Sequence, residues 1–181
     1  MNKHILTSII CLLTSIAAEA KSKNHPCHTK SGLTTCDHIQ LESFKGSGHI
    51  IFNHTQINGF CSIKGVLKSQ ESQLNQLIAF GHIELTASTI HQNAIITGHL
   101  NLKNSDTKAL LKIYGNQATL TNSNTQSIEM SNSHSSPTLY LNEQTTVHGD
   151  INFTDTAGTV VLSKQASILG KIINGNQTQA L

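Results

Sequence analysis

Short runs of alternating apolar and polar residues follow a set of evenly spaced glycines in this chain. The glycines are separated by 17, 16, 17 and 17 residues, and they are Gly48, Gly65, Gly81, Gly98 and Gly115. The second and fourth positions after the first four glycines read Ile50, Leu67, Ile83 and Leu100, then Phe52, Ser69, Leu85 and Leu102. Apolar residues two positions apart predict strands that bury one side, and the polar breaks between such runs predict corners.

The same units contain further apolar columns and one hydroxyl column. The ninth, thirteenth and fifteenth positions read Ile57, Leu74, Ile90 and Thr107, then Cys61, Ile78, Ala94 and Leu111, then Ile63, Phe80, Ile96 and Ile113. The seventh position reads Thr55, Ser72, Ser88 and Ser105, which suits a corner because hydroxyl side chains bond the local backbone. A unit this short cannot bury its apolar side alone and must stack on its neighbours. The pattern therefore predicts an all-β fold, a single parallel β-solenoid (β-helix) with right-handed coils of about 17 residues.

A second repeat lies nearer the C-terminus. Residues 139–151 match residues 160–172 at an offset of 21, which aligns Gly149 with Gly170. The coils therefore lengthen in this region, with residues 155–158 as the expected turn insertion, while the pattern leaves the register of residues 117–138 open. We interpret residues 46–175 as the solenoid, residues 21–45 as an N-terminal leader or cap, and residues 176–181 as a tail. Caps are expected because uncovered end strands pair with other copies.

The glycine-anchored coils resemble those of the bactofilin-type polymer-forming β-helix proteins. The resemblance is clearest in residues 146–151 (TVHGDI) and 167–172 (SILGKI), and a G-x-[IV] rhythm extends it over roughly residues 46–175. It implies a β-helical scaffold that polymerises end to end without nucleotide. Bactofilins are generally cytoplasmic, and this chain departs from them because its N-terminal residues are predicted to be an export signal. It is also similar to small exported bacterial solenoids of unknown role.

Residues 1–20 have the three parts of a secretory signal peptide. Lys3 supplies the basic start, residues 5–18 are an apolar run, and Ala18, Glu19 and Ala20 form the cleavage motif. The apolar run is too short for a membrane-spanning helix, so we expect no integral membrane segment in the mature chain. Lipid attachment at Cys11 is less favoured because the residues before it are bulky. The sequence thus predicts export from a bacterial cell, to the periplasm or beyond.

Three cysteines remain after the predicted cleavage, and two of them lie close together. In an oxidising compartment Cys27 and Cys36 are expected to form a disulfide that closes a short loop. The alternative is a soft-metal or zinc site built from these cysteines with the neighbouring His25, His28 and His38. The third cysteine, Cys61, falls in an apolar column, where we expect a small buried side chain.

Composition supports this architecture and excludes some partners. Charged residues make up 12% of the chain, and Asn, Gln, Ser and Thr together contribute 67 of its 181 residues. Like charges stacked at strand spacing repel each other, so a solenoid favours such a composition. The formal net charge is +2 and all 12 basic residues are lysines, whereas a nucleic-acid binder would use a basic face and arginine forks. We therefore expect no nucleic-acid partner, and we expect no cofactor.

Eleven histidines raise the question of metal binding. His82 and His99 follow glycines in adjacent units, so they should stack about 5 Å apart on the outer surface. With a third ligand or water such a pair could hold a divalent metal ion, and the alternative is a surface ladder of neutral imidazoles. His54, His91 and His148 fall at turns and strand ends, where histidine is unremarkable.

An enzymatic alternative rests on the acids near the C-terminus. β-Helices often present a carbohydrate groove, and glycoside hydrolysis needs two carboxylates about 5–9 Å apart. Glu143, Asp150 and Asp155 are the candidates for a polysaccharide lyase or hydrolase, with ordinary solvated turn acids as the alternative. The absence of arginine weakens the lyase hypothesis, and no serine-nucleophile or phosphate-loop motif occurs.

These observations favour an exported structural or adhesive β-solenoid without catalytic activity. Such a protein would act by self-association into a homo-polymer or homo-oligomer, or as a flat surface for a protein or polysaccharide. The alternatives are the carbohydrate-active enzyme and a metal-binding exported protein.

Overall fold

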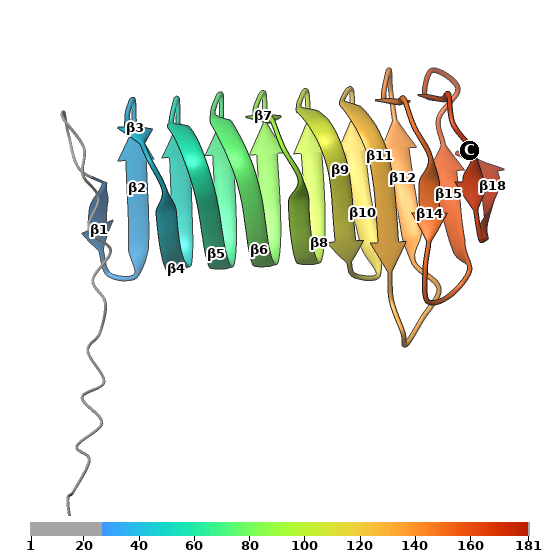
Figure 1. Ribbon diagram of the computed structural model, residues 1–181, viewed down its shortest axis with the longest axis horizontal. Coiled ribbons are helices and arrows are strands. Elements are labelled where there is room, and N and C mark those ends of the chain that lie inside the picture. Colours follow the sequence, from blue (N-terminus) through green and yellow to red (C-terminus); the bar gives the residue numbers. More distant parts are fainter. Residues whose placement is uncertain (1–26, 181) are drawn as a thin grey trace, which may run out of the picture.

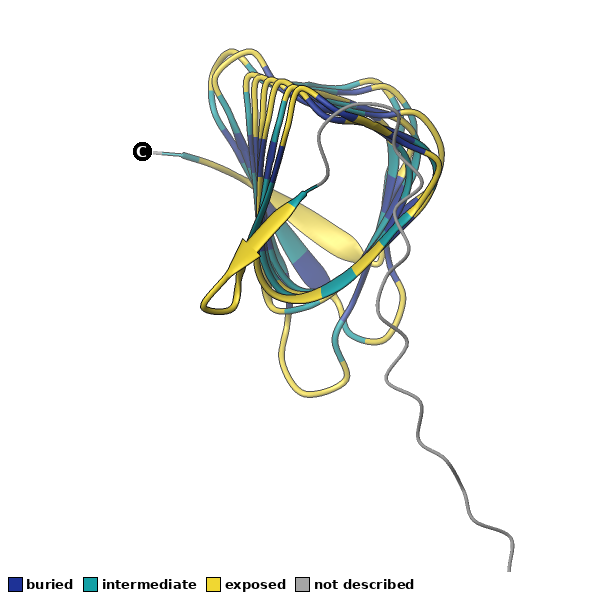
Figure 2. Ribbon diagram, turned by 90° about the vertical axis from the view of Figure 1, so that its left-hand side faces the viewer, coloured by how far each residue is buried: buried dark blue, intermediate teal, exposed yellow. Residues whose placement is uncertain are grey.

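The structure is a computed structural model, and it describes residues 27–180. The predicted signal peptide, Cys11 and His25 lie outside the described residues. The described residues form eighteen strands and no helix, and all strands join in one continuous sheet. Figure 1 shows the strands side by side along the long axis of the molecule, from β1 to β18. Figure 2 looks along this axis and shows the coils superimposed around a common centre.

The coils stack into three flat sides, which we call faces A, B and C. Face A consists of β2 (Leu33–Asp37), the ends of β4 (Phe44–Asn53), β5 (Gln56–Gln70), β6 (Gln73–Thr86) and β8 (Ala94–Lys103), and then β10 (Gln117–Thr121), β12 (Thr138–Asn142), β15 (Gly158–Leu162) and β18 (Gly175–Gln179). Face B consists of β3 (Gln40–Leu41), the starts of β5 and β6, β7 (Thr89–Ile90), the starts of β9 (Asp106–Tyr114) and β11 (Asn124–Ser131), β13 (Thr146–Val147) and β16 (Ser167–Ile168).

Face C is formed by segments that lie between faces B and A along the chain. It consists of the start of β4, the middles of β5 and β6, the start of β8, the ends of β9 and β11, and then β14 (Ile151–Phe153) and β17 (Ile172–Ile173). All pairings between successive coils are parallel, which confirms the predicted β-solenoid. The exception is β1 (His28–Lys30), which folds back antiparallel on β2.

The coils extend through most of the described chain. Strands β2 and β3 lie within residues 21–45 and already pair with β4 and β5 in the parallel register, and β18 continues to Gln179. On face A the pairing continues through residues 100–141, because Leu102 pairs with Leu120 and Leu120 with Leu141. Between β9 and β11 the register shifts by one residue between Thr125 and Ser127. The predicted offset of 21 near the C-terminus is confirmed by the pairings of β12 with β15, β13 with β16 and β14 with β17.

The predicted apolar columns form the core, with one correction. The thirteenth and fifteenth columns contain Leu77 and Ala79, which are fully buried, in place of Ile78 and Phe80. The register shifts by one residue between Ile57 and Phe60, so the next coil is one residue shorter before face C. Counting forward from Gly65 crosses this shortened corner, and a slip of one residue moves each side chain to the opposite side of the sheet. Ile78 and Phe80 therefore point outward.

The hydroxyl column forms a continuous buried ladder at the corner between faces A and B. It runs through Thr55, Ser72, Ser88, Ser105, Ser123 and Thr145. Each backbone N–H up to that of Ser123 donates to the hydroxyl oxygen of the next coil, over 3.1–3.4 Å. Each hydroxyl in turn donates to a carbonyl two or three residues before it. The ladder thus satisfies backbone groups that the turn removes from the strand pairing.

Substituting Ser88 by Ala should destabilise the solenoid by about 1–3 kcal/mol, because the buried N–H of Ser72 loses its acceptor. Ser88→Thr is the matched control, because it keeps the hydroxyl and threonine already occupies this column at Thr55. We expect its free energy of unfolding, measured in urea, to stay closer to that of the parent chain. Equal values for Ser88→Ala and the parent would show that the ladder does not contribute to stability.

Candidate functional site

Seven successive coils turn from face A into face B through one residue with a left-handed backbone. These residues have φ between 47° and 52°, and they are His38, His54, Glu71, Ala87, Asn104, Asn122 and Glu143. The N–H of each of the first six donates to a backbone carbonyl of the following coil, so the corner repeats with the same geometry. Side chains at this corner project from successive coils at strand spacing, about 4.8 Å apart. Residues far apart in the sequence therefore meet in one outward-facing column.

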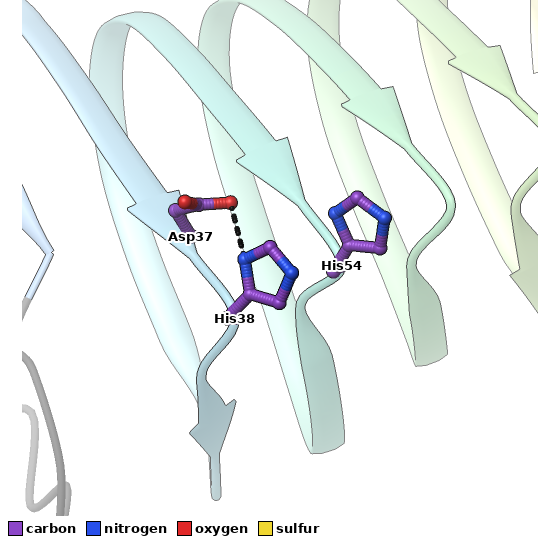
Figure 3. Close-up of side chains that lie close together, drawn as sticks. All are labelled: Asp37, His38 and His54. Atoms are coloured by element: carbon purple, nitrogen blue, oxygen red, sulfur yellow. Dashed lines mark hydrogen bonds and ion pairs between the residues drawn. The ribbon is translucent and has the colours of Figure 1, made fainter.

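At the N-terminal end this column brings together two histidines and two acids. We call Asp37, His38, His54 and Glu71 the histidine corner, and three of them are drawn in Figure 3. Nδ1 of His38 lies 3.0 Å from Oδ1 of Asp37, and Nε2 of His54 lies 2.9 Å from Oε2 of Glu71. The two imidazole rings are stacked with centroids 4.3 Å apart and planes 14° from parallel. All four side chains are substantially exposed.

The histidine corner has the donor set of a small cation site. One ligand atom from each of Asp37, His38 and His54 lies within 4.8 Å of the others, and in residues 27–180 this is the one such group of three. The pKa of Glu71 is lowered by the side-chain amide of Gln70 and by the His54 imidazole, which favours the ionised carboxylate. The sequence predicts His54 at a turn but does not connect it with His38. The signal was their spacing of 16 residues, one coil, just before the start of face B.

The pair predicted from the sequence, His82 and His99, is also present. These residues lie on adjacent coils of face A, and their rings stack with centroids 4.9 Å apart and planes 5° from parallel. Nε2 of His82 lies 2.9 Å from one carboxylate oxygen of Glu84, and the ammonium of Lys68 lies 3.3 Å from the other. Hydrogen bonds from His82 and Lys68 lower the pKa of Glu84. The predicted stacking is confirmed, whereas metal binding by this pair stays a prediction.

Two of the described cysteines form a disulfide, and the third is buried in the core. Cys27 and Cys36 form a disulfide that ties the start of the described chain to β2. Both sulfur atoms are used in this bond, so they offer no thiolate to the metal site considered as the alternative. Cys61 is fully buried in face C, as predicted, and burial raises the pKa of its thiol well above the ordinary value. A protonated and inaccessible thiol is a packing group rather than a nucleophile.

The three candidate catalytic acids lie at three different corners. Glu143 belongs to the left-handed corner between faces A and B. Asp150 lies between β13 and β14, where its Oδ1 accepts the N–H of Lys171 over 2.8 Å. Asp155 lies between β14 and β15 and accepts a hydrogen bond from the Ser131 hydroxyl. It lines a hollow of about 300 Å³ in which it is the one acid. The geometry therefore does not assemble these acids into the carboxylate pair that glycoside hydrolysis requires.

Face C presents an unusual outer surface for this chain. Phe60, Phe80 and Tyr114 are three of the six exposed large apolar side chains in residues 27–180, with 41%, 45% and 41% exposure. They project from face C or its edge, beside the outward-pointing and partly buried Ile78 and Ile95. We call these five residues the aromatic strip. Soluble monomers rarely expose grouped apolar side chains without a binding role.

Charges beside the aromatic strip are held in defined positions. The ammonium of Lys112 lies 2.5 Å from Oε1 of Glu129 on the next coil, and 5.3 Å from the ring centre of Tyr114. The Glu129 carboxylate and the Tyr114 hydroxyl both raise the pKa of Lys112. The phenol ring and the lysine are therefore fixed relative to each other on a flat surface.

Comparisons of this chain with protein-family models, curated proteins and solved structures find no match. The resemblance to bactofilins thus stays a prediction, while the β-solenoid that it implies is present. In the described part of the chain there is no helix long and apolar enough to span a membrane.

Proposed function

We propose that this protein is an exported structural β-solenoid, without catalytic activity, that self-associates side by side through face C. The observation that carries the proposal is the aromatic strip. The chain has only two tyrosines, five phenylalanines and no tryptophan, yet three of these seven aromatic side chains are exposed on one flat side. Buried aromatic side chains dominate the binding energy of protein interfaces.

The ends of the stack are less suited to association than its side. At the N-terminal end β1 pairs antiparallel with β2 and covers the edge of face A. At the C-terminal end β18 is exposed throughout, and its Gln177 and Gln179 occupy the columns that contain Val160 and Leu162 in the coil before. A polar terminal strand is the usual cap of a repeat protein. This argues for lateral association rather than the end-to-end polymer that the bactofilin resemblance implies.

A second copy fits the aromatic strip because the strip can pair with itself. An interface about a twofold axis joins the same surface of two protomers, and a flat strip of aromatic and branched apolar side chains is self-complementary. The lysines and acids along face C also favour this arrangement, because Lys112 and Glu129 of one copy can approach the opposite charges of the other. Partners of other chemistry, including polysaccharides, are the competing occupants.

The double substitution Phe80→Ser and Tyr114→Ser tests this function. Sedimentation velocity over a range of concentrations should show the parent chain as a dimer or larger assembly, and the double variant should dissociate at least tenfold more readily. The control is Leu33→Ser with Leu169→Ser, which removes two exposed apolar side chains near the ends of the stack. It should associate like the parent. A strictly monomeric parent, or dissociation caused by the control pair alone, would contradict lateral association.

A further inference from the structure

We propose that the histidine corner is a binding site for one divalent transition metal ion, with Zn²⁺ as the representative ion. Two imidazoles and two carboxylates converge there from three successive coils. Imidazole nitrogens that are oriented by carboxylates suit zinc, copper and nickel, whereas Mg²⁺ prefers oxygen ligands. This site lies at the corner between faces A and B, away from face C, so it is independent of the proposed self-association.

The hydrogen bonds of the two histidines assign their nitrogens to different tasks. Asp37 holds Nδ1 of His38, and Glu71 holds Nε2 of His54. This leaves Nε2 of His38 and Nδ1 of His54 for a metal ion, and Figure 3 shows these two atoms on the facing sides of the rings. A metal-bound histidine commonly donates its second nitrogen to a carboxylate, which orients the ring and makes it a better ligand. Both histidines of the corner already have this support.

The backbone beneath the site is fixed while the side-chain ends remain adjustable. The N–H of His38 donates to the carbonyl of Asn53, and the N–H of His54 donates to the carbonyl of Gln70, both over 3.0 Å. The two side chains are 68% and 44% exposed, so their rings can tilt from the stacked arrangement to point both nitrogens at one ion. Water molecules would complete the coordination sphere at such an open surface.

The charges around the two histidine stacks favour metal binding at the histidine corner over metal binding by His82 and His99. The corner has two carboxylates against its two imidazoles, and each carboxylate lies within hydrogen-bond distance of one of them. Beside His82 and His99, by contrast, the single carboxylate of Glu84 is shared with the Lys68 ammonium. A fixed positive charge next to a cation site repels the ion. The two stacks therefore provide a matched comparison within one chain.

Calorimetric titration with Zn²⁺ tests this site in the full chain, purified without a histidine tag and treated with EDTA. The variant is His54→Asn, and asparagine already occupies the same left-handed corner at Asn104 and Asn122, so the fold should be retained. We expect the tightest Zn²⁺ site of the parent to weaken at least tenfold in His54→Asn and to be unchanged in His99→Asn. Mg²⁺ should give no binding heat in any of them.

Thermal unfolding with and without Zn²⁺ tests the same site independently of calorimetry. Zn²⁺ should raise the melting temperature of the parent and of His99→Asn, because a ligand that binds only the folded state stabilises it, and it should not do so in His54→Asn. Circular dichroism would verify that each variant is folded. Parent-like Zn²⁺ affinity in His54→Asn, loss of the site in His99→Asn, or absence of Zn²⁺ binding to the parent would each overturn the assignment.

Discussion

Replacing Ile83 by Asp is expected to abolish folding of the solenoid. Ile83 is fully buried in face A, where its backbone pairs with those of Leu67 and Leu100 in the coils on either side. A carboxylate at this position would have apolar neighbours on both adjacent coils and no partner. An unpaired buried charge, or the proton uptake that neutralises it, costs several kcal/mol, about 4 kcal/mol in typical cases. The total stability of a domain is only about 5–15 kcal/mol, so most of it would be lost.

His82→Asp is the matched control, because it places the same side chain one residue earlier on the outer side of the same strand. The His82 side chain is 43% exposed, and a carboxylate there stays in water. We expect this variant to give the far-ultraviolet circular dichroism spectrum of the parent and a cooperative urea transition. Ile83→Asp should show neither. If the two variants unfolded at the same urea concentration, the assignment of inner and outer columns in face A would be wrong.

The fold could be predicted from the sequence because stacking imposes one chemical class on each column. Ile50, Leu67, Ile83 and Leu100 all occupy the same inner position, so their period is visible without coordinates. The prediction failed locally where one coil loses a residue at a corner, at Ile78 and Phe80, because counting from the preceding glycine cannot locate a deletion within the unit. That local error conceals the aromatic strip, since the glycine count places Phe80 in the core.

The histidine corner could not be predicted because its column has no common residue type. The left-handed corner holds histidine, glutamate, alanine and asparagine in different coils, so neither hydropathy nor charge repeats along it. What these residues share is a backbone conformation. The neighbouring hydroxyl ladder does have a common residue type, since its side chains bond the backbone of the next coil, and it was visible in the sequence.

The bounds of the solenoid illustrate the same distinction. Residues 33–41 form a coil whose inner positions include Cys36, Ile39 and Leu41. Gly32 precedes this coil 16 residues before Gly48, but Thr34 stands where the next coil has Ile50, so no apolar alternation reveals the strand. Gly149 and Gly170, which align in the second repeat, lie between β13 and β14 and between β16 and β17, at the corner between faces B and C. The first five glycines instead lie between faces C and A. A glycine period in a solenoid thus marks a column where the backbones of adjacent coils lie close together. It does not identify at which corner of the coil that column lies.

Substituting Gly81 by Ala is expected to destabilise the solenoid by about 4 kcal/mol, for two separable reasons. Gly81 has φ of +130°, a backbone conformation that costs a residue with a Cβ about 2 kcal/mol. A Cβ there would also lie 2.0 Å from the carbonyl oxygen of Gly65 on the preceding coil. Because that atom belongs to paired backbone, the coils must separate locally, at a further cost of about 2 kcal/mol.

Gly32 provides the control: its φ is +79°, but a Cβ would meet nothing within 4 Å. In urea unfolding, Gly32→Ala should therefore lose only the conformational contribution, about half as much free energy as Gly81→Ala. Equal losses would mean that the coils are not held at the close spacing that the glycine column implies.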